Sequence, residues 1–199
     1  MTPGRLRGAL AGHPISRLDV DALRRGYLGS PGALREAAVL VPVYFHADGA
    51  PHVLMTRRRN DLRLHPGQIS WPGGRIDPCD ADSRAAALRE AHEEIGLDPD
   101  HVEVVGRLSE ALAVLSGFRL TPWVGLVPYP YTYVAQPAEV AGLVELSVAA
   151  LLAPGAHRIE KAEAFGMVHE VHTFEVAGEQ VWGASARILH ELLTVWRTA

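Results

Sequence analysis

The hydrophobic pattern of this chain predicts a strand hairpin followed by a long loop. Residues 37–45 are almost continuously apolar and rich in valine, which is typical of a buried strand. Asp48-Gly49 then indicates a turn, and residues 51–56 form the returning strand. Residues 58–82 show no periodicity, and a loop of that length in a compact domain is usually functional.

The other periodic segments predict both helices and strands, which fits an α/β fold class. An amphipathic helix is expected over residues 17–28, with Leu18, Ala22, Leu23 and Tyr27 on one side. A second, alanine-rich helix is expected over residues 83–95. The segments that follow are strands near 101–108, 110–115 and 118–127, a short helix at 148–152, a strand at 168–176 and a C-terminal helix at 183–197.

Composition changes the picture by exclusion. A length of 199 residues fits one domain with a sizeable core, and a mean hydropathy near zero is typical of a soluble globular protein. The net charge of −4 gives no global cationic field for nucleic acid. Cys79 is the single cysteine, so no internal disulfide forms, which suits a reducing cytoplasm. The run at 37–45 is too short to cross a bilayer, and the start lacks an apolar signal core.

Three carboxylates fall within five residues of the second predicted helix. Glu90, Glu93 and Glu94 share one helix face, with Cβ atoms ~5–6 Å apart. Such a cluster by itself is more often a solvated acidic surface. Their mutual repulsion is relieved by a divalent cation, and Mg²⁺ prefers a few carboxylates together with substrate phosphates. Arg89 precedes Glu93 by one helical turn and can orient it.

The residues before this helix favour the metal interpretation. Residues 71–74 (Trp-Pro-Gly-Gly) form a tight turn with free backbone N–H groups. Asp82 or Ser83 can cap the helix, and Gly96 suits its left-handed end. A glycine turn therefore leads into a capped helix that carries the acids.

Residues 74–97 resemble the Nudix box of the pyrophosphohydrolases. The shared pattern is a glycine, a spacer, Arg-Glu, two residues, Glu-Glu, one residue, then glycine and an aliphatic residue. The spacer is one residue longer than usual, as expected in the coenzyme A pyrophosphatase branch. Counting forward from Gly74 places the spacer acid on Asp80, whereas counting back from the arginine reaches Ala81. Either Asp80 or Asp82 takes that place.

Residues 54–74 are similar to the signature of that branch upstream of the box. Arginine replaces the usual serine at position 59, and tryptophan replaces the usual phenylalanine at 71. The resemblance covers about residues 37–193. It implies the Nudix fold, a mixed β-sheet sandwiched between α-helices, as one domain with residues 1–36 a helical extension and 37–199 the core. The positions in register with the signature are Arg58, Arg63, Gly67 and Trp71.

The resemblance also implies roles at the site. Mg²⁺ or Mn²⁺ is held by the three glutamates, with the Gly74 carbonyl as a further ligand. Glu90, or an acid outside the helix, accepts the proton of the attacking water. Glu139 matches a position where the family often has a functional glutamate, and Glu160 and Glu163 are its rivals.

The expected substrate is coenzyme A or a derivative. Water would cleave its pyrophosphate to 4′-phosphopantetheine and 3′-phospho-AMP. A guanidinium donates to phosphate in a planar fork, so Arg58 and Arg63 are the expected substrate contacts, together with the glycine-loop residues Gly67 and Gly73. Two alternatives stay open: another nucleotide substrate such as ADP-ribose or a nucleoside triphosphate, and a catalytically silent ligand-binding module.

Other partners receive little support from the sequence. No nucleic acid or membrane contact is expected, and a monomer and a homodimer are both compatible with the chain. The ten histidines show no zinc-ligand spacing, and His169 and His172 should face opposite sides of a strand. The sequence therefore predicts structural or surface roles for all of them.

Overall fold

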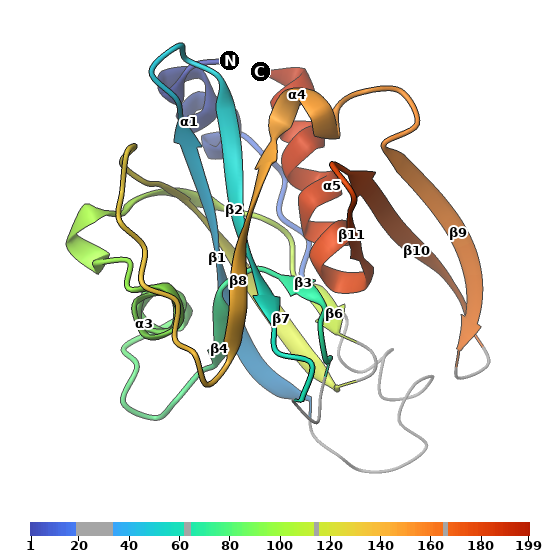
Figure 1. Ribbon diagram of the computed structural model, residues 1–199. Coiled ribbons are helices and arrows are strands. Elements are labelled where there is room, and N and C mark those ends of the chain that lie inside the picture. Colours follow the sequence, from blue (N-terminus) through green and yellow to red (C-terminus); the bar gives the residue numbers. More distant parts are fainter. Residues whose placement is uncertain (19–33, 62–64, 114–115, 165–166) are drawn as a thin grey trace.

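Strand β1 (Arg35–Phe45) shows how the central sheet is covered on both faces. Ala38 and Leu40 belong to one apolar cluster, whereas Val39 and Val41 belong to another. This alternation is what a strand buried on both sides requires. The computed structural model describes residues 1–18, 34–61, 65–113, 116–164 and 167–199 (Figure 1).

The main sheet is mixed, because β1 pairs antiparallel with β2 (Pro51–Arg58) and parallel with β7 (Phe118–Leu126). Its order in the described residues is β3-β2-β1-β7-β5. The remaining strands are β3 (Ile69–Ser70) and β8 (Val140–Ser147) beside β2, β4 (Gly73–Arg75) beside β1, and β5 (Glu103–Arg107) and β6 (Ala111–Ala113) beside β7.

Two helices cover the opposite faces of this sheet (Figure 1). Helix α3 (Ser83–Ile95) packs against one face through fully buried alanines at 86, 87 and 91. Helix α5 (Gly183–Thr198) packs against the other through Ile188, Leu189 and Leu192. The expected α/β fold, a mixed sheet between helices, is therefore confirmed.

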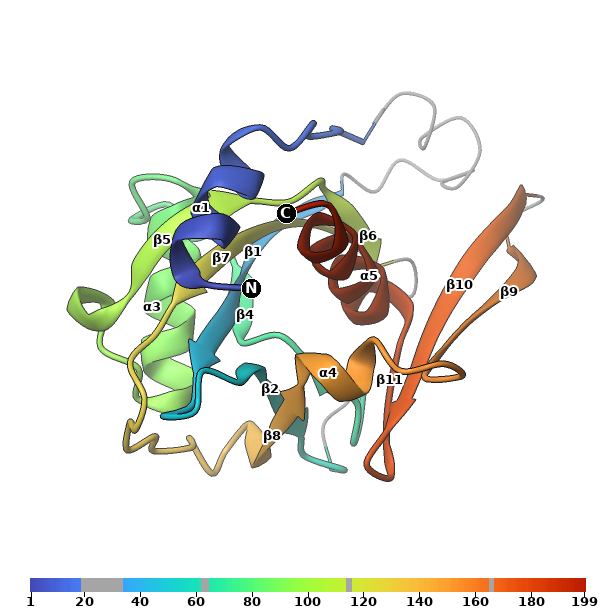
Figure 2. The ribbon, with the colours of Figure 1, turned by 90° about the horizontal axis from the view of Figure 1, so that it is seen from above.

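A second, antiparallel sheet lies beyond α5, which is sandwiched between the two sheets (Figure 2). It consists of β9 (His157–Ala164), β10 (Met167–Val176) and β11 (Glu179–Trp182). Phe174 and Val181 of this sheet join the same apolar cluster as α5. The short elements are α1 (Pro3–Ala11), the 3₁₀ turn Pro99–His101 and α4 (Val148–Leu151).

The predicted elements and the observed ones agree best along the middle of the chain. The helix expected over residues 83–95 has those bounds, and α5 and β7 are close to prediction. Most of the helix expected over 17–28 lies outside the described residues. The sequence pattern missed α1, β8, β9 and β11, and the long loop contains β3 and β4. Within the described residues, no helix combines the length and apolarity needed to cross a membrane.

Candidate functional site

The acidic residues are presented by the β4–α3 segment. Gly73 and Gly74 pair with Val39 and Ala38 of β1, which fixes the turn against the sheet. The carboxylate of Asp82 accepts from the backbone N–H of the third helical residue at 2.8 Å and caps α3. The helix ends at Gly96 with a φ of 66°, as expected. These anchors turn the acidic face of α3 toward β4.

Glu94 is the buried acid of this face, with 5% of its surface exposed. Its Oε2 accepts a 3.3 Å hydrogen bond from the Gly73 N–H. Burial raises the pKa of Glu94 to about 8, and the negative charges of Glu90 and Glu139 act in the same direction. Arg58 opposes the shift of this pKa. An ionised Glu94 therefore gains from a cation at this position.

Glu90 lies directly against the glycine turn. A Cβ atom built at Gly74 would come within 2.5 Å of its carboxyl group, so only glycine leaves room for this approach. Burial also raises the pKa of Glu90, while its contact with Arg89 opposes the shift. Glu93 and Glu139 add further negative charge, which raises this pKa. The carboxyl group of Glu90 is thus held against the backbone of Gly74.

Arg89 ties the box acids to the spacer. Its Nε and one terminal nitrogen each donate to Asp80 at 2.9 Å, and the pair holds the pKa of Asp80 below its usual range. Its other terminal nitrogen donates to Glu90 at 3.0 Å and to Glu93 at 3.2 Å. Asp80 is therefore the spacer acid that pairs with the box arginine, and Asp82 is the cap. The sequence had left these two positions open.

The donor set fits a hard divalent cation. Glu90, Glu93 and Glu94 offer carboxylate oxygens on one helix face, and Gly74 leaves the backbone within their reach. The side chain of Glu93 is 57% exposed and can rotate. Such rotation is required, because the oxygens of the three glutamates do not all lie within 4.8 Å of one another.

Glu139 is the outside acid that comes near the box. Its turn is attached to the end of α3, where Gln136 N–H donates to the Glu94 carbonyl at 2.8 Å. The charge of Glu139 raises the pKa of both Glu90 and Glu94. The rivals at positions 160 and 163 are exposed on β9, on the opposite side of the molecule from α3 (Figures 1 and 2).

The arginines at positions 57 to 59 differ in their contacts: two form ion pairs, and one lies beside the acidic face of α3. Arg57 pairs with Glu179 of β11, and Arg59 pairs with Asp61 at 2.5 Å. Arg58 ends β2, and its buried Nε has no hydrogen-bond partner among the described residues. The predicted contact at position 63 lies outside the described part of the chain.

The remaining loop residues shape and brace the turn. Gly67 has a φ of 68°, and a Cβ atom there would come within 2.4 Å of Asn60 Oδ1. Trp71 is buried, and its Nε1 donates to the Ser185 carbonyl of α5 at 3.1 Å. The start of α5 therefore supports the loop that leads into β4. The sequence indicated Trp71 as a motif residue but not this contact.

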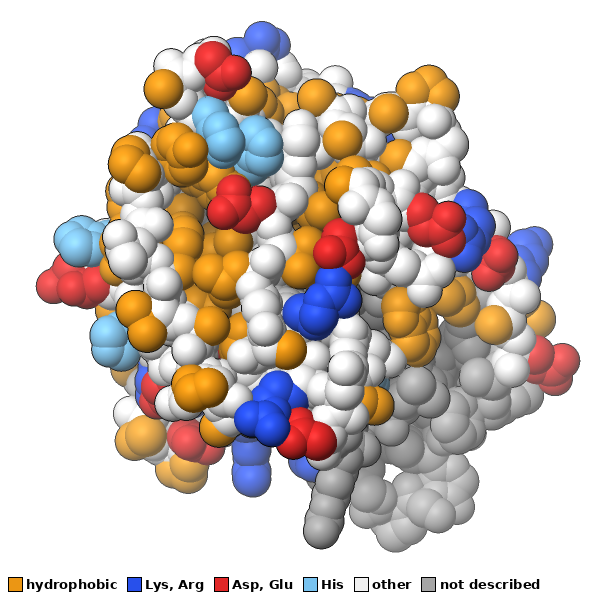
Figure 3. Space-filling view, in the orientation of Figure 1, with side chains coloured by type: hydrophobic (Ala, Val, Ile, Leu, Met, Phe, Trp, Pro, Cys, Tyr) orange, Lys and Arg blue, Asp and Glu red, His pale blue; other side chains and the backbone are white. Residues whose placement is uncertain are grey.

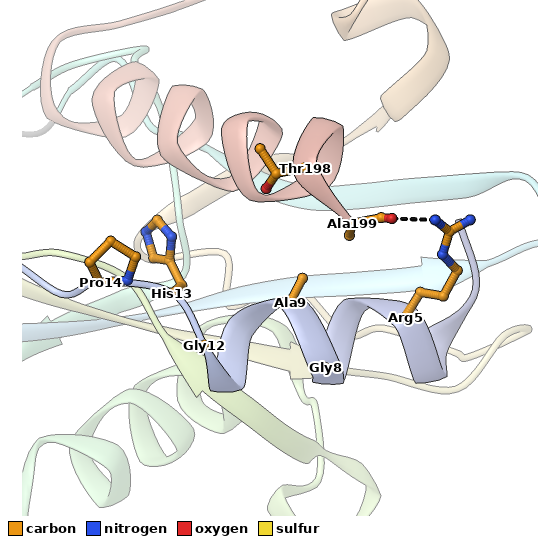
Figure 4. Close-up of a pocket in the computed structure, with 8 residues that line it drawn as sticks. All are labelled: Arg5, Gly8, Ala9, Gly12, His13, Pro14, Thr198 and Ala199. Atoms are coloured by element: carbon orange, nitrogen blue, oxygen red, sulfur yellow. Dashed lines mark hydrogen bonds between the residues drawn. The ribbon is translucent and has the colours of Figure 1, made fainter.

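A pocket of about 450 Å³ lies elsewhere, between α1 and the end of α5 (Figure 4). Arg5 reaches across it and bonds to the Ala199 carbonyl oxygen. Its lining includes none of the residues predicted for the site. On the face shown in Figure 3, acidic and basic side chains are interspersed rather than gathered.

Sequence reasoning also missed a cluster of histidines. His157, His172 and His190 come from β9, β10 and α5, and one ring nitrogen of each lies within 4.8 Å of the others. Zinc-ligand spacing is a pattern within one segment, so it does not reveal ligands that three separate elements bring together. The one signal in the sequence was the repeated occurrence of histidine between positions 157 and 190.

Comparison with known proteins identifies the family to which this chain is similar. The model of the NUDIX domain matches residues 34–165. A protein of Enterobacter sp. (strain 638) named "Uncharacterized Nudix hydrolase NudL" is 39% identical over 158 residues, 79% of this chain and 81% of the relative. Its namesake in Cronobacter sakazakii is 40% identical over the same shares. A crystal structure of a MutT/nudix family protein from Enterococcus faecalis aligns with a TM-score of 0.58 at 12% identity, covering 96% of this chain and 73% of that one, and supports the fold alone.

Proposed function

We propose that this chain, which belongs to the Nudix hydrolase family, hydrolyses the pyrophosphate of coenzyme A and its derivatives. The family assignment itself gives a hydrolase with a small, nucleotide-like substrate. Water adds to one phosphorus atom and the bridging P–O bond breaks, leaving 4′-phosphopantetheine and 3′-phospho-AMP. We also propose one Nudix domain, with residues 37–199 as its core and 1–36 as an extension.

The position of Arg58 is the observation that carries this proposal. It belongs to the upstream signature shared with coenzyme A pyrophosphatases, and it lies close enough to lower the pKa of Glu94. Its Nε is buried without a partner among the described residues, whereas Arg57 and Arg59 are already paired with carboxylates. A guanidinium with donors to spare beside carboxylates suits a phosphate of a substrate bound at the box.

The two signature arginines then divide the substrate between them. Arg58 lies beside the box acids, so we assign it to the pyrophosphate. The 3′-phosphate, which distinguishes coenzyme A from other nucleotide substrates, falls to Arg63 on the strength of the signature alone. Gly67 and Gly73 allow the tight packing of this turn, since a Cβ atom at either position would collide with neighbouring protein atoms. In the structure the N–H of Gly73 donates to Glu94 and that of Gly67 to the Arg59 carbonyl, so a contact of either N–H with phosphate would replace an existing hydrogen bond.

A divalent ion such as Mg²⁺ or Mn²⁺, when bound, neutralises the pyrophosphate charge and promotes ionisation of water. Glu90, Glu93 and Glu94 would hold it, with Gly74 as the backbone neighbour. Arg89 positions the carboxylates of Glu90 and Glu93 through its hydrogen bonds. Glu139, on the turn attached to α3, would accept the proton of the attacking water, with Glu90 as the alternative acceptor.

The box glutamates and the upstream signature also bear on the two alternative functions. A silent ligand-binding module would be expected to lose box glutamates, and all three are present. A hydrolase of ADP-ribose or nucleoside triphosphates needs the box but has no use for the upstream signature. The signature therefore favours coenzyme A.

The test is a hydrolysis screen with coenzyme A, 3′-dephospho-coenzyme A, ADP-ribose, NADH and deoxynucleoside triphosphates, with and without Mg²⁺. Products are identified by mass spectrometry, and Glu93→Gln serves as the inactive control. We expect coenzyme A to have the highest kcat/KM and to yield the two products named above. Efficient cleavage of ADP-ribose or triphosphates with neither coenzyme compound cleaved would refute the substrate assignment and leave the family assignment intact.

A further inference from the structure

The histidine cluster comprises His157, His172 and His190 and lies between α5 and the second sheet. His157 Nε2 and His172 Nδ1 are 3.1 Å apart. The ring of His190 lies 4.8 Å from that of His157 and 4.6 Å from that of His172, centroid to centroid. Each residue offers one nitrogen within 4.8 Å of the others, and in the described residues no other His, Cys, Asp or Glu group of three or more does so.

Strand pairing explains why these side chains meet. His157 of β9 is directly opposite Phe174 of β10, and His172 precedes Phe174 by two residues. Side chains two apart on a strand share a face, so all three project from one side of the hairpin. That side packs against α5, where His190 lies (Figure 2). His172 is consequently only 3% exposed, whereas the other two histidines are partly exposed.

We propose that His157, His172 and His190 bind a divalent transition-metal ion of the zinc class, which joins β9 and β10 to α5. Imidazole nitrogens suit zinc and its neighbours, whereas Mg²⁺ requires oxygen ligands. Nitrogens bound to one tetrahedral zinc at about 2.0–2.1 Å are separated by roughly 3.3 Å. Two of the three nitrogens already have nearly that separation, and a modest rotation of His190 brings in the third. Water takes the fourth position from the partly exposed side.

An alternative interpretation is a hydrogen-bonded core stack without any ion. The two rings of His157 and His172 are indeed stacked, 5.2 Å apart at an interplanar angle of 13°. However, the hydrogen bond between them uses a single nitrogen of His172. Its Nε2 is buried with no hydrogen-bond partner in the described part of the chain, which core histidines rarely tolerate. A stack without an ion therefore leaves the second nitrogen of this buried ring unsatisfied, which argues against a purely structural role.

The electrostatics of the cluster are compatible with neutral ligands. Burial lowers the pKa of all three histidines, that of His172 to about 4, so each ring keeps a lone pair at neutral pH. Arg187 and Arg197 face the cluster and lower these pKa values further. Glu170 and Glu191 act in the opposite direction and offset that positive charge.

The test measures zinc uptake and thermal stability of the full chain. Metal is removed with a chelator, the chelator is removed, and saturating Mg²⁺ is added to occupy the box. Zinc is then titrated, and the zinc retained after desalting and the melting temperature Tm are recorded. Cobalt serves as a second probe, because four-coordinate Co²⁺ gives an intense visible absorption. The variants are His157→Gln and His190→Gln, which are partly exposed, with His172→Gln as a third. The matched control is His101→Gln, an exposed histidine outside the cluster.

We expect about one zinc per wild-type chain and a higher Tm, both unchanged in His101→Gln and in Glu93→Gln. His157→Gln and His190→Gln should lower the zinc affinity by roughly a hundredfold or more, since even the loss of an outer-shell partner costs 10–100-fold. Zinc binding in these two variants that equals the wild type would overturn the proposal. So would zinc uptake that disappears in Glu93→Gln, because the box would then be the site. Hydrolytic activity does not enter either readout, so the proposal stands apart from the substrate assignment.

Discussion

The acidic face of α3 and the histidine cluster are two groups of potential metal ligands on opposite sides of one fold. The α3 group lies within five consecutive residues of a single helix. The histidine cluster draws one residue from each of three elements and forms only when β9, β10 and α5 pack together. The contrast shows that a linear motif reports only the sites whose ligands share one segment.

Burial acts on the two groups with opposite consequences. At Glu94 it favours the neutral acid, which is the form that does not bind a cation. At His172 it favours the neutral ring, which is the form that does. Glu94 therefore ionises more readily when a cation is bound beside it, whereas His172 is already in the neutral form that binds a metal.

Chelation is the change that should separate the two groups most strongly. We expect EDTA to abolish hydrolysis and Mg²⁺ or Mn²⁺ to restore it, with an alkaline optimum, because hard oxygen ligands at the box select such ions. Zinc added alone should raise Tm but should not restore full activity. The measurement is turnover and Tm on the same samples. Undiminished hydrolysis after exhaustive chelation would contradict the role assigned to the acidic face.

Removal of one box carboxylate should have the next largest effect. We expect Glu93→Gln and Glu94→Gln each to lower kcat by roughly 10²–10³-fold at saturating Mg²⁺, because each removes a charge used in the transition state. Glu160→Gln, an exposed acid on β9, is the matched control and should keep wild-type turnover. A variant of the box with normal kcat would remove that glutamate from the site.

The basic loop offers a smaller and more selective test. If Arg63 binds the 3′-phosphate, Arg63→Ala should lower kcat/KM for coenzyme A roughly ten- to a hundredfold more than for 3′-dephospho-coenzyme A, as a charge-assisted hydrogen bond is worth ~1.5–3 kcal/mol. Arg58→Ala should lower kcat/KM for both substrates to the same extent, because we assign Arg58 to the pyrophosphate that they share. Equal losses in the Arg63 variant would reject the 3′-phosphate role and leave the hydrolase assignment standing.

The last test concerns stability without metal, where the two groups should respond to pH in opposite directions. The pKa of Glu94 is raised in the folded state, so the folded protein loses stability as the pH rises from about 4.5 to about 8. Glu94→Gln should therefore raise Tm in EDTA at pH 8. The corresponding gain in the free energy of unfolding should be on the order of a few kcal/mol.

The lowered pKa of His190 means that stability is instead lost as the pH falls below its ordinary value of 6.5. His190→Gln should reduce that acid-side loss and leave the alkaline side unchanged. Denaturant unfolding across pH 4–9 measures both slopes. A Glu94→Gln variant that is less stable than the wild type at pH 8 in EDTA would contradict the inferred cost of burying this carboxylate in its ionised form.

The sequence predicted the parts of this molecule that depend on local order. The bounds of α3 follow from the Asp82 cap, the alanine run and Gly96, all of which act within one or two turns. The choice between Asp80 and Asp82 required the structure, because it rests on which carboxylate reaches Arg89 in space. The role of each predicted site residue remains a prediction for the experiments above.

The parts that the sequence did not predict depend on packing or on a weak pattern. Strand β9 is largely polar, so its strand character comes from pairing with β10 rather than from its own periodicity. Helix α1 contains two glycines of low helical propensity, and the Thr2 cap and the burial of Leu6 and Leu10 against the rest of the core offset them. The histidine cluster belongs to the same class.

The parallel pairing of β1 with β7 has a consequence for the order in which the chain folds during synthesis. Arg35 aligns with Phe118 and Val43 with Leu126, so the centre of the sheet cannot close until both segments have left the ribosome. Helix α3, which lies between them in the sequence, emerges earlier. Its buried alanines have only the β1–β2 hairpin to cover them until β7 arrives. The α3 face that carries the acidic residues is therefore fully packed against the sheet only late in synthesis, after β7 has emerged.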